Sequence, residues 1–259
     1  DFNDLVVNYR TTLIDKDGQA IGYKIEGEMV GIGAEFHNGF AVRLYQTIAD
    51  DTDKRILRSQ IDASSINLTI NGVTQSHSIL EQGVEDAIFI IMPDTWDFAD
   101  KQSGCSYFRT EIGCDTNSKV SFSLTVSLQD GVTTIEAPKY TLDPFIFAAQ
   151  DHYHGEFLVG QNPRGWEVHI KNKPPTEKFN SQLFSVADSD DASNSTENYY
   201  FQTNTGLPWA MEIGSVWAHP KENTDITHVY SDFKAFAESV GREKPLWFNN
   251  AKLENVISR

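Results

Sequence analysis

Oxygen-bearing side chains crowd the first positions of this chain, which begins Asp1-Phe2-Asn3-Asp4 and continues into Leu5-Val6-Val7. Calcium is a hard cation that takes roughly six to eight oxygen ligands, and Asp carboxylates and Asn carbonyl groups supply them in short acidic loops. The β-branched run that follows predicts a strand. We therefore expect Asp1, Asn3 and Asp4 to bind Ca²⁺ and to fix the start of a core strand. The alternative is an Asx-rich turn, in which these side chains bond only to nearby backbone groups.

A second acidic cluster lies in the most polar stretch of the chain, residues 185–198. Aspartates that alternate on an irregular loop can direct several carboxylates at one cation, although the glycine and the distal glutamate of an EF-hand loop are missing. We expect a second calcium ion here, used for ligand binding and flanked by exposed aromatic rings. The three aspartates are the predicted metal ligands, and the whole predicted ligand-binding set is Asp188, Asp190, Asp191, Ser193, Tyr199 and Tyr200. A solvated polar loop followed by core aromatics is the alternative.

Two histidines, His152 and His154, are separated by one residue. On a strand both imidazoles would share a face, an arrangement that can bind zinc or copper. A third ligand at a diagnostic spacing is missing, and His169 is only one candidate for it. Two hydrogen-bonding histidines in a loop are therefore the preferred interpretation.

Signatures of catalysis are missing from the sequence. It contains no Gly-x-Ser-x-Gly, no His-Glu-x-x-His and no phosphate-binding Gly-Lys-Ser loop. Paired carboxylates for glycoside hydrolysis depend on their separation in space, which 37 acidic residues leave open. We predict a binding module rather than an enzyme.

The only two cysteines are Cys105 and Cys114. They lie in a polar, glycine-containing loop with a short separation, which suits a loop disulfide and an oxidising compartment. Two free thiols are the alternative. Two cysteines alone do not complete a zinc site.

The elements that must position these residues are mostly β. Short apolar runs separated by Gly, Asn and Asp predict strands over residues 5–14, 20–32, 40–48, 66–70, 87–92, 120–128, 157–159 and 166–170. The stretch 120–128 alternates apolar and polar residues, and the continuous apolar run 87–92 is typical of a strand buried on both faces. Turns are predicted at Asp17-Gly18 and Asn71-Gly72.

Helix is scarce in the pattern. One helix is predicted over residues 225–240, capped by Thr224 or Asp225 and ended by Gly241. Together the elements predict a mostly β fold, a β-sandwich or jelly-roll-like domain with one C-terminal α-helix packed on it. We expect residues 1–259 to form a single ligand-binding domain, and the start on Asp1 suggests a module excised from a larger protein.

The net charge is −16, from 21 basic and 37 acidic residues. Nucleic acids and anionic membrane surfaces both require Lys and Arg, so neither is an expected partner. The sequence has no apolar run of about 18 residues, so membrane insertion is not expected.

Short motifs along the chain resemble those of the LruC-type (DUF4842-like) domain of bacterial cell-surface proteins. The opening Asp1–Val7 resembles that family's first motif, and Gly33-Ala34-Glu35-Phe36-His37-Asn38-Gly39-Phe40 resembles Gly-Ala-x-x-His-Asn-Gly-Phe. Three further blocks and the closing segment 225–241 also resemble the family: Asp143-Pro144-Phe145-Ile146, Glu167-Val168-His169-Ile170 and Leu207-Pro208-Trp209-Ala210. In the first of these blocks Asp143 replaces the family's Asn.

The resemblance implies an extracellular, calcium-dependent, mostly β module. Related domains occur in repeats-in-toxin (RTX) adhesins, where they bind peptides or proteins. We therefore expect a monomeric adhesion module at the bacterial cell surface, binding a peptide or protein ligand on a host or neighbouring cell through a loop Ca²⁺. A carbohydrate-binding module that uses Ca²⁺ and aromatic rings on a glycan, and a structural spacer stiffened by Ca²⁺, are the alternatives.

Overall fold

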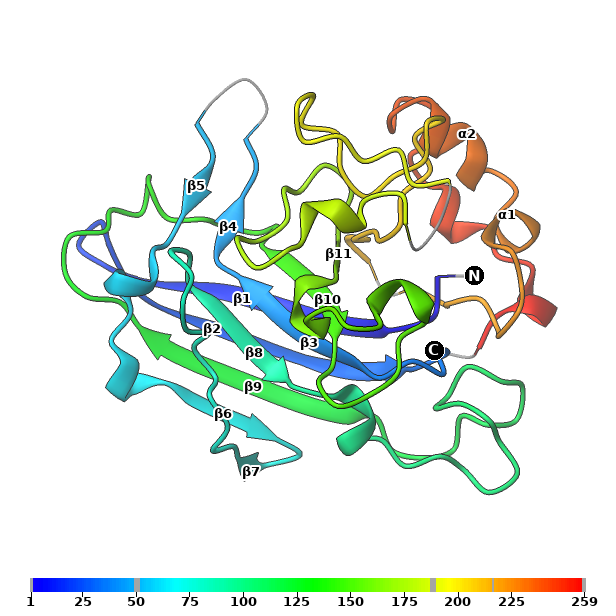
Figure 1. The fold of residues 1–259 in the computed structure, drawn as a ribbon, viewed down its shortest axis with the longest axis horizontal. Helices are drawn as coiled ribbons and strands as arrows, with labels where there is room; N and C mark the ends of the chain where they lie inside the picture. The colour runs from blue at the N-terminus through cyan, green and yellow to red at the C-terminus, as the bar shows by residue number, and fades with distance from the viewer. Residues whose placement is uncertain (1, 49–51, 187–189, 216, 258–259) are drawn as a thin grey trace.

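Two antiparallel sheets pack face to face in the computed structural model, which describes residues 2–48, 52–186, 190–215 and 217–257 (Figure 1). The first sheet has the order β1 (Val6–Lys16), β2 (Gln19–Gly31), β9 (Val120–Ser127), β6 (Asn67–Ile70) and β7 (Val73–Thr74). The second has the order β11 (Glu167–His169), β10 (Asp143–Ala148), β3 (Asn38–Arg43) and β8 (Ile88–Met92). A ribbon of β4 (Tyr45–Gln46) and β5 (Lys54–Arg55) extends from the second sheet.

The main core lies between the two sheets, as the alternation predicts. Every second side chain of β9, including Phe122 and Leu124, is buried there. The rings of Phe40 on β3 and Phe122 on β9 pack edge to face with their centroids 5.9 Å apart, which links the two sheets. On β8, Phe89 and Ile91 enter this core, while Ile88 and Ile90 belong to a second apolar cluster on the other side. The predicted sandwich is therefore confirmed.

Both predicted hairpin turns form through residues with positive φ. Asp17 and Gly18 have φ of 51° and 81°, and Asn71 and Gly72 have φ of 48° and 78°. Two consecutive left-handed residues match the right-handed twist of the flanking strands. The predicted strand at 157–159 is wrong. A 3₁₀ helix, Glu156–Leu158, stands there and follows Gly155, whose φ is 103°.

The predicted C-terminal helix is divided into α1 (Ile226–Val229) and α2 (Phe233–Glu238). Asp225 caps α1 by accepting a hydrogen bond from the Thr227 backbone, and Gly241 with φ of 80° ends α2, as predicted. The break follows from packing. The Tyr230 ring is fully buried, and its hydroxyl donates to the Ala218 carbonyl group at 2.6 Å.

Short 3₁₀ helices connect many of the strands. They span Arg58–Gln60, Ala63–Ser65, Thr95–Asp97, Glu156–Leu158, Pro163–Gly165, Ser181–Leu183, Trp247–Asn249 and Leu253–Asn255. None of the helices in the described ranges has the length and apolar character needed to cross a bilayer.

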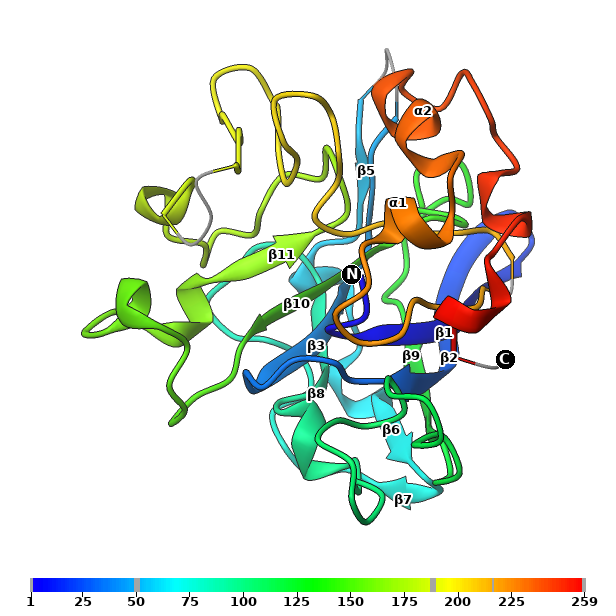
Figure 2. The same cartoon turned by 90° about the vertical axis from the view of Figure 1, so that its right-hand side faces the viewer.

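The start of β1 lies beside α1 and the segment that leads into it (Figures 1 and 2). The Phe2 ring packs edge to face on Phe233 of α2, with centroids 5.7 Å apart. An extended loop around the two cysteines projects from the same end of the sandwich. The start of β1, the segment that leads into α1 and this loop are thereby gathered in one region.

Candidate metal centre

Asn3 occupies the centre of this region and is fully buried. Its backbone carbonyl group accepts a hydrogen bond from the Gly33 N–H at 2.9 Å, and its Nδ2 donates to the Pro220 carbonyl group at 3.2 Å. Its Oδ1 has no hydrogen-bond partner among the described residues. An unpaired buried acceptor costs about 1–3 kcal/mol, so in native proteins such an atom usually has a protein group, an ordered water or an ion as its partner.

A carboxylate oxygen faces the same small space as Asn3 Oδ1. A Cβ atom placed on Gly33 would stand 2.4 Å from Asn3 Oδ1 and 2.5 Å from Glu222 Oε2. Only glycine leaves room for both oxygens. Glu222 is held by its backbone N–H, which donates to the Thr110 carbonyl group at 2.8 Å, and Thr110 Oγ1 lies 3.4 Å from Glu222 Oε2.

Negative charge accumulates at this point. Part of the Asp4 side chain is exposed, yet the protein atoms crowded around its carboxylate desolvate it and raise its pKa. Desolvation raises the pKa of Glu222, and the neighbouring charge of Asp4 raises it further. Burial likewise raises the pKa of the Tyr107 hydroxyl. The negative charges of nearby carboxylates raise it further, and Glu222 has the largest effect among them. A cation bound among these groups would offset their repulsion.

The donor set fits calcium. Asn3 Oδ1 and the Glu222 carboxylate, which meet at Gly33, are hard oxygen ligands, and the Thr110 hydroxyl lies beside Glu222. Asp4 lies near enough for its charge to raise the pKa of Glu222. An ion bound there would give Asn3 Oδ1 its missing partner and offset the repulsion between Asp4 and Glu222. Asp1, the first predicted ligand, lies outside the described residues. No local pattern in the sequence marks Glu222, Thr110 or Gly33 as parts of this centre, because their proximity arises only from the tertiary fold.

The second predicted calcium loop is arranged differently. Asp191 Oδ1 accepts hydrogen bonds from the Ser193 backbone N–H and hydroxyl and from Trp209 Nε1, and its Oδ2 accepts one from the Ser185 N–H. These bonds give Asp191 a structural role, in which it holds the loop to Trp209. Asp188 lies outside the described residues. The calcium site at Asp190 and Asp191 stays a prediction.

The aromatic flank of this loop is less exposed than expected. Tyr200 is buried, and its ring lies near Phe184 and Phe201. The Tyr199 hydroxyl donates to the Thr203 carbonyl group at 2.5 Å, and Ser193 Oγ accepts from the Phe201 N–H at 2.8 Å. Tyr200 therefore belongs to the packing beneath the loop, which is the alternative that the sequence left open.

A groove adjoins the Asn3–Glu222 centre. Its walls are the disulfide loop on one side and the segment 221–223 on the other, and its lining residues are Ser106, Tyr107, Glu111, Ile112, Lys221, Glu222 and Asn223. Cys105 and Cys114 are joined by a disulfide, which closes the loop. Glu111 folds back and accepts hydrogen bonds from the Ser106 and Tyr107 N–H groups. Glu222 thus belongs both to the candidate metal centre and to the groove.

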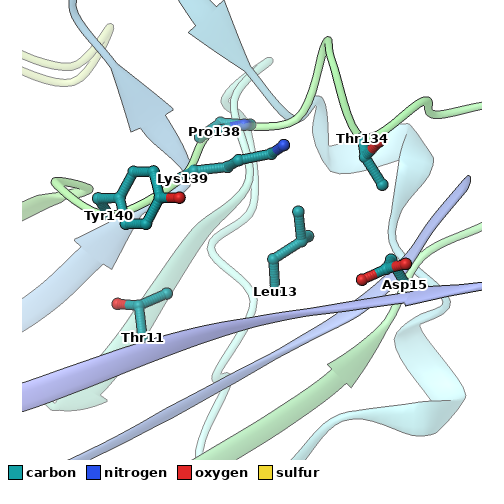
Figure 3. A pocket seen from close by; sticks show the side chains of 7 residues that line it. All are labelled: Thr11, Leu13, Asp15, Thr134, Pro138, Lys139 and Tyr140. Carbon is teal, nitrogen blue, oxygen red and sulfur yellow. The ribbon is translucent and has the colours of Figure 1, made fainter. Parts of the chain in front are cut away.

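A second concavity lies over β1 (Figure 3). Its lining residues are Thr11, Leu13, Asp15, Thr134, Pro138, Lys139 and Tyr140. It offers Asp15 as its single carboxylate, so it lacks the donors that a calcium ion requires.

The less favoured alternative, a zinc or copper site of His152 and His154 with His169, does not form. His154 is buried, and its Nε2 bonds to the Ala149 carbonyl group at 2.8 Å. His169 is fully buried, with its Nδ1 3.0 Å from Asp143 Oδ1 and its Nε2 2.9 Å from Glu167 Oε2. The reason is that residues 152–154 do not continue β10 as a strand, so the two side chains do not share a face.

Comparisons with known proteins place the chain in a family. A model of the family described as "Domain of unknown function (DUF4842)" matches residues 18–248. The chain belongs to the DUF4842 family. The matched span of this DUF4842 chain includes Gly33, Thr110 and Glu222, whereas Asn3 and Asp4 precede it.

The fold of this DUF4842 chain also occurs in a solved structure. The crystal structure of a putative lipoprotein from Bacteroides ovatus matches with a TM-score of 0.69 at 14% sequence identity, covering 100% of this chain and 70% of that one. At that identity the likeness shows the fold alone. No curated protein matches the sequence.

Proposed function

We propose that this DUF4842 domain is a calcium-dependent binding module of a bacterial cell-surface protein, of the LruC type and similar to the peptide-binding modules of RTX adhesins. The observation that carries the proposal is the buried Oδ1 of Asn3, which has no hydrogen-bond partner in the described chain and faces Glu222 across Gly33. A bound Ca²⁺ completes this arrangement. It links the start of β1 to the segment that precedes α1.

The ligand that fits best is a peptide with a free carboxylate. Calcium needs more oxygens than Asn3, Asp4 and Glu222 supply, and an anionic oxygen entering along the groove is a favourable addition. Ile112 and Tyr107 provide apolar contact in the groove, and Lys221 provides a positive charge. Ile112 is 64% exposed, so its side chain is available for apolar contact with a ligand in the groove.

The cell-surface part of the proposal has two supports. The Cys105–Cys114 disulfide persists only in oxidising surroundings. The Bacteroides ovatus protein that shares the fold is described as a putative lipoprotein, which fits a location in the cell envelope.

The test is a binding screen in Ca²⁺ and in EGTA against three probes: peptides with free C-terminal carboxylates, the same peptides as C-terminal amides, and a glycan array. We expect Ca²⁺-dependent binding that favours the free carboxylates. Ile112→Glu should weaken it at least tenfold, because a negative charge then lines the groove. Val73→Glu is the matched control, since Val73 has the same exposure on β7.

Each alternative has its own outcome in this screen. Binding to glycans and not to peptides would replace the proposal with a carbohydrate-binding module. No binding to any probe, with calcium still bound, would favour the structural spacer, for which the deep burial of Asn3 is the specific support.

A further inference from the structure

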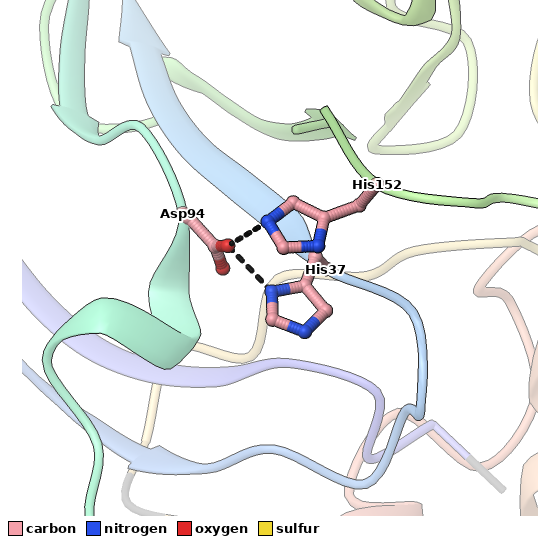
Figure 4. Close-up of side chains that lie close together, drawn as sticks. All are labelled: His37, Asp94 and His152. Carbon is pink, nitrogen blue, oxygen red and sulfur yellow. Dashed lines mark hydrogen bonds and ion pairs between the residues drawn. The ribbon is translucent and has the colours of Figure 1, made fainter. Parts of the chain in front are cut away.

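Two imidazoles and a carboxylate converge at one end of the second sheet (Figure 4). His37 directly precedes β3, Asp94 follows β8 at the cap of the 3₁₀ helix Thr95–Asp97, and His152 follows β10. Because β3 runs antiparallel to both β8 and β10, its first residues lie beside the last residues of the other two strands. The topology therefore brings together side chains that are far apart in the sequence.

The three ligand atoms are close enough to share an ion. Asp94 Oδ2 lies 2.5 Å from His37 Nδ1 and 3.2 Å from His152 Nε2, and all three atoms lie within 4.8 Å of one another. Ligands stand about 2.0–2.2 Å from a tetrahedral zinc ion, so neighbouring ligand atoms are about 3.3 Å apart. The two imidazole rings are stacked in parallel, with centroids 3.7 Å apart and an interplanar angle of 4°. A metal lies in the plane of an imidazole that ligates it, so one of these partly exposed rings turns about its side-chain bonds when both nitrogens bind one ion.

The surroundings hold this arrangement in place. Asp94 is buried, and its other oxygen, Oδ1, accepts a hydrogen bond from the Trp96 N–H at 2.9 Å, which fixes the carboxylate while leaving Oδ2 for the histidines. Supporting bonds of this kind orient the ligands of metal sites. The backbone of His37 is fixed as well, since its carbonyl group accepts from the Ala149 N–H at 3.0 Å.

We propose that His37, Asp94 and His152 form a binding site for Zn²⁺ or a similar transition metal, separate from the calcium centre. Two imidazole nitrogens and one carboxylate are a zinc ligand set that leaves a coordination position open. Nitrogen ligands favour transition metals over Ca²⁺, which prefers oxygen. The side chains of His37 and His152 are 35% and 39% exposed, so the open position faces solvent and can take water or an anionic ligand.

The site is tested by titrating Zn²⁺ into the full chain in buffer saturated with Ca²⁺, followed by calorimetry. Absorption of Co²⁺ as a substitute for Zn²⁺ is the second readout, because its spectrum reports nitrogen ligation directly. The variants are His152→Asn and Asp94→Asn. The second of these keeps an oxygen that can accept from Trp96. The control is His228→Asn, an exposed histidine outside the cluster.

We expect wild-type protein to bind one equivalent of Zn²⁺. The affinity should be at least tenfold weaker in both cluster variants and unchanged in the His228→Asn control. Melting curves of the variants in EDTA show that each is folded. Wild-type protein without saturable binding, cluster variants with wild-type affinity, or an equal loss in His228→Asn would each overturn the proposal.

Discussion

Asn3 shows how much of the candidate site one residue type reveals. Oxygen side chains ahead of an apolar run predict calcium from their chemistry alone, and the tertiary structure adds that one of those oxygens is buried with no partner among the described residues. The sequence could not supply Glu222, because one carboxylate among 37 acidic residues has no local signal that marks it. Gly33 was visible only as part of a family-like block, and its spatial role emerges from the oxygens that surround it.

Gly33→Ala is the sharpest change at the residue scale. The added methyl group would stand 2.4 Å from Asn3 Oδ1 and 2.5 Å from Glu222 Oε2, so at least one ligand must move. We expect Ca²⁺ affinity to fall at least tenfold and the free energy of unfolding to fall by about 1–3 kcal/mol, the usual cost of overpacking. Calorimetry and urea unfolding measure the two effects.

Gly214→Ala is the matched control for that change, because a Cβ at Gly214 meets no atom within 4 Å. If Gly33→Ala and Gly214→Ala bound Ca²⁺ equally well, the oxygens around Gly33 would not be the calcium ligands.

At the scale of elements, the sequence predicted strands wherever a two-residue period or a continuous apolar run was present. β9 and β8 are the clearest cases. Prediction from the sequence failed where tertiary packing determines the backbone conformation. The helix at 226–238 is interrupted because the buried ring of Tyr230 bonds to Ala218, and the apolar triplet at 157–159 forms a 3₁₀ turn after Gly155. Neither contact has a counterpart in local periodicity.

The strands β10, β11 and β3 share a buried ionic network that should make stability depend on pH. Burial by itself raises the pKa of Glu167, but the hydrogen bond and charge of His169, with Arg164, outweigh it and lower that pKa to about 2. Burial by itself lowers the pKa of His169, but Asp143 and Glu167 raise it above its usual range.

The two pKa shifts make the stability of the fold depend on pH in opposite directions. The stability from Glu167 is present above its unfolded pKa of about 4.3 and is lost as the pH falls toward 2. The stability from His169 is fully present below about pH 6.5 and is lost as the pH rises through its raised pKa. The network therefore stabilises the fold most between these two limits.

His169→Gln should destabilise the protein by about 3–5 kcal/mol near pH 5.5, because it leaves buried carboxylates without their partner. The difference from wild type should shrink as the pH rises, since the wild-type protein loses the same contribution. Urea unfolding followed by tryptophan fluorescence from pH 5 to 9 measures it, with the exposed His228→Gln as control. A difference that does not vary with pH would show that His169 contributes by packing alone.

For the molecule as a whole, the proposed calcium ion would connect the start of β1 to the C-terminal segment. The start of β1 and the segment before α1 meet at Asn3 through the Pro220 carbonyl group and the Phe2–Phe233 ring contact. An ion held by Asp4 on one side and Glu222 on the other would fix the C-terminal segment to the sandwich. It would also offset part of a net charge of −16.

The most direct test of this account is the melting temperature of the full chain in EGTA and in millimolar Ca²⁺. Ca²⁺ at a hundredfold excess over its dissociation constant should add about 2.7 kcal/mol, and each kcal/mol is worth about 2–4 °C for a domain of this size. Asp4→Asn and Glu222→Gln should lose most of that increase, whereas Glu243→Gln, an exposed residue in the loop after α2, should keep it. An unchanged midpoint in wild-type protein, or a full increase in Glu222→Gln, would contradict the calcium centre at Asn3, Asp4 and Glu222.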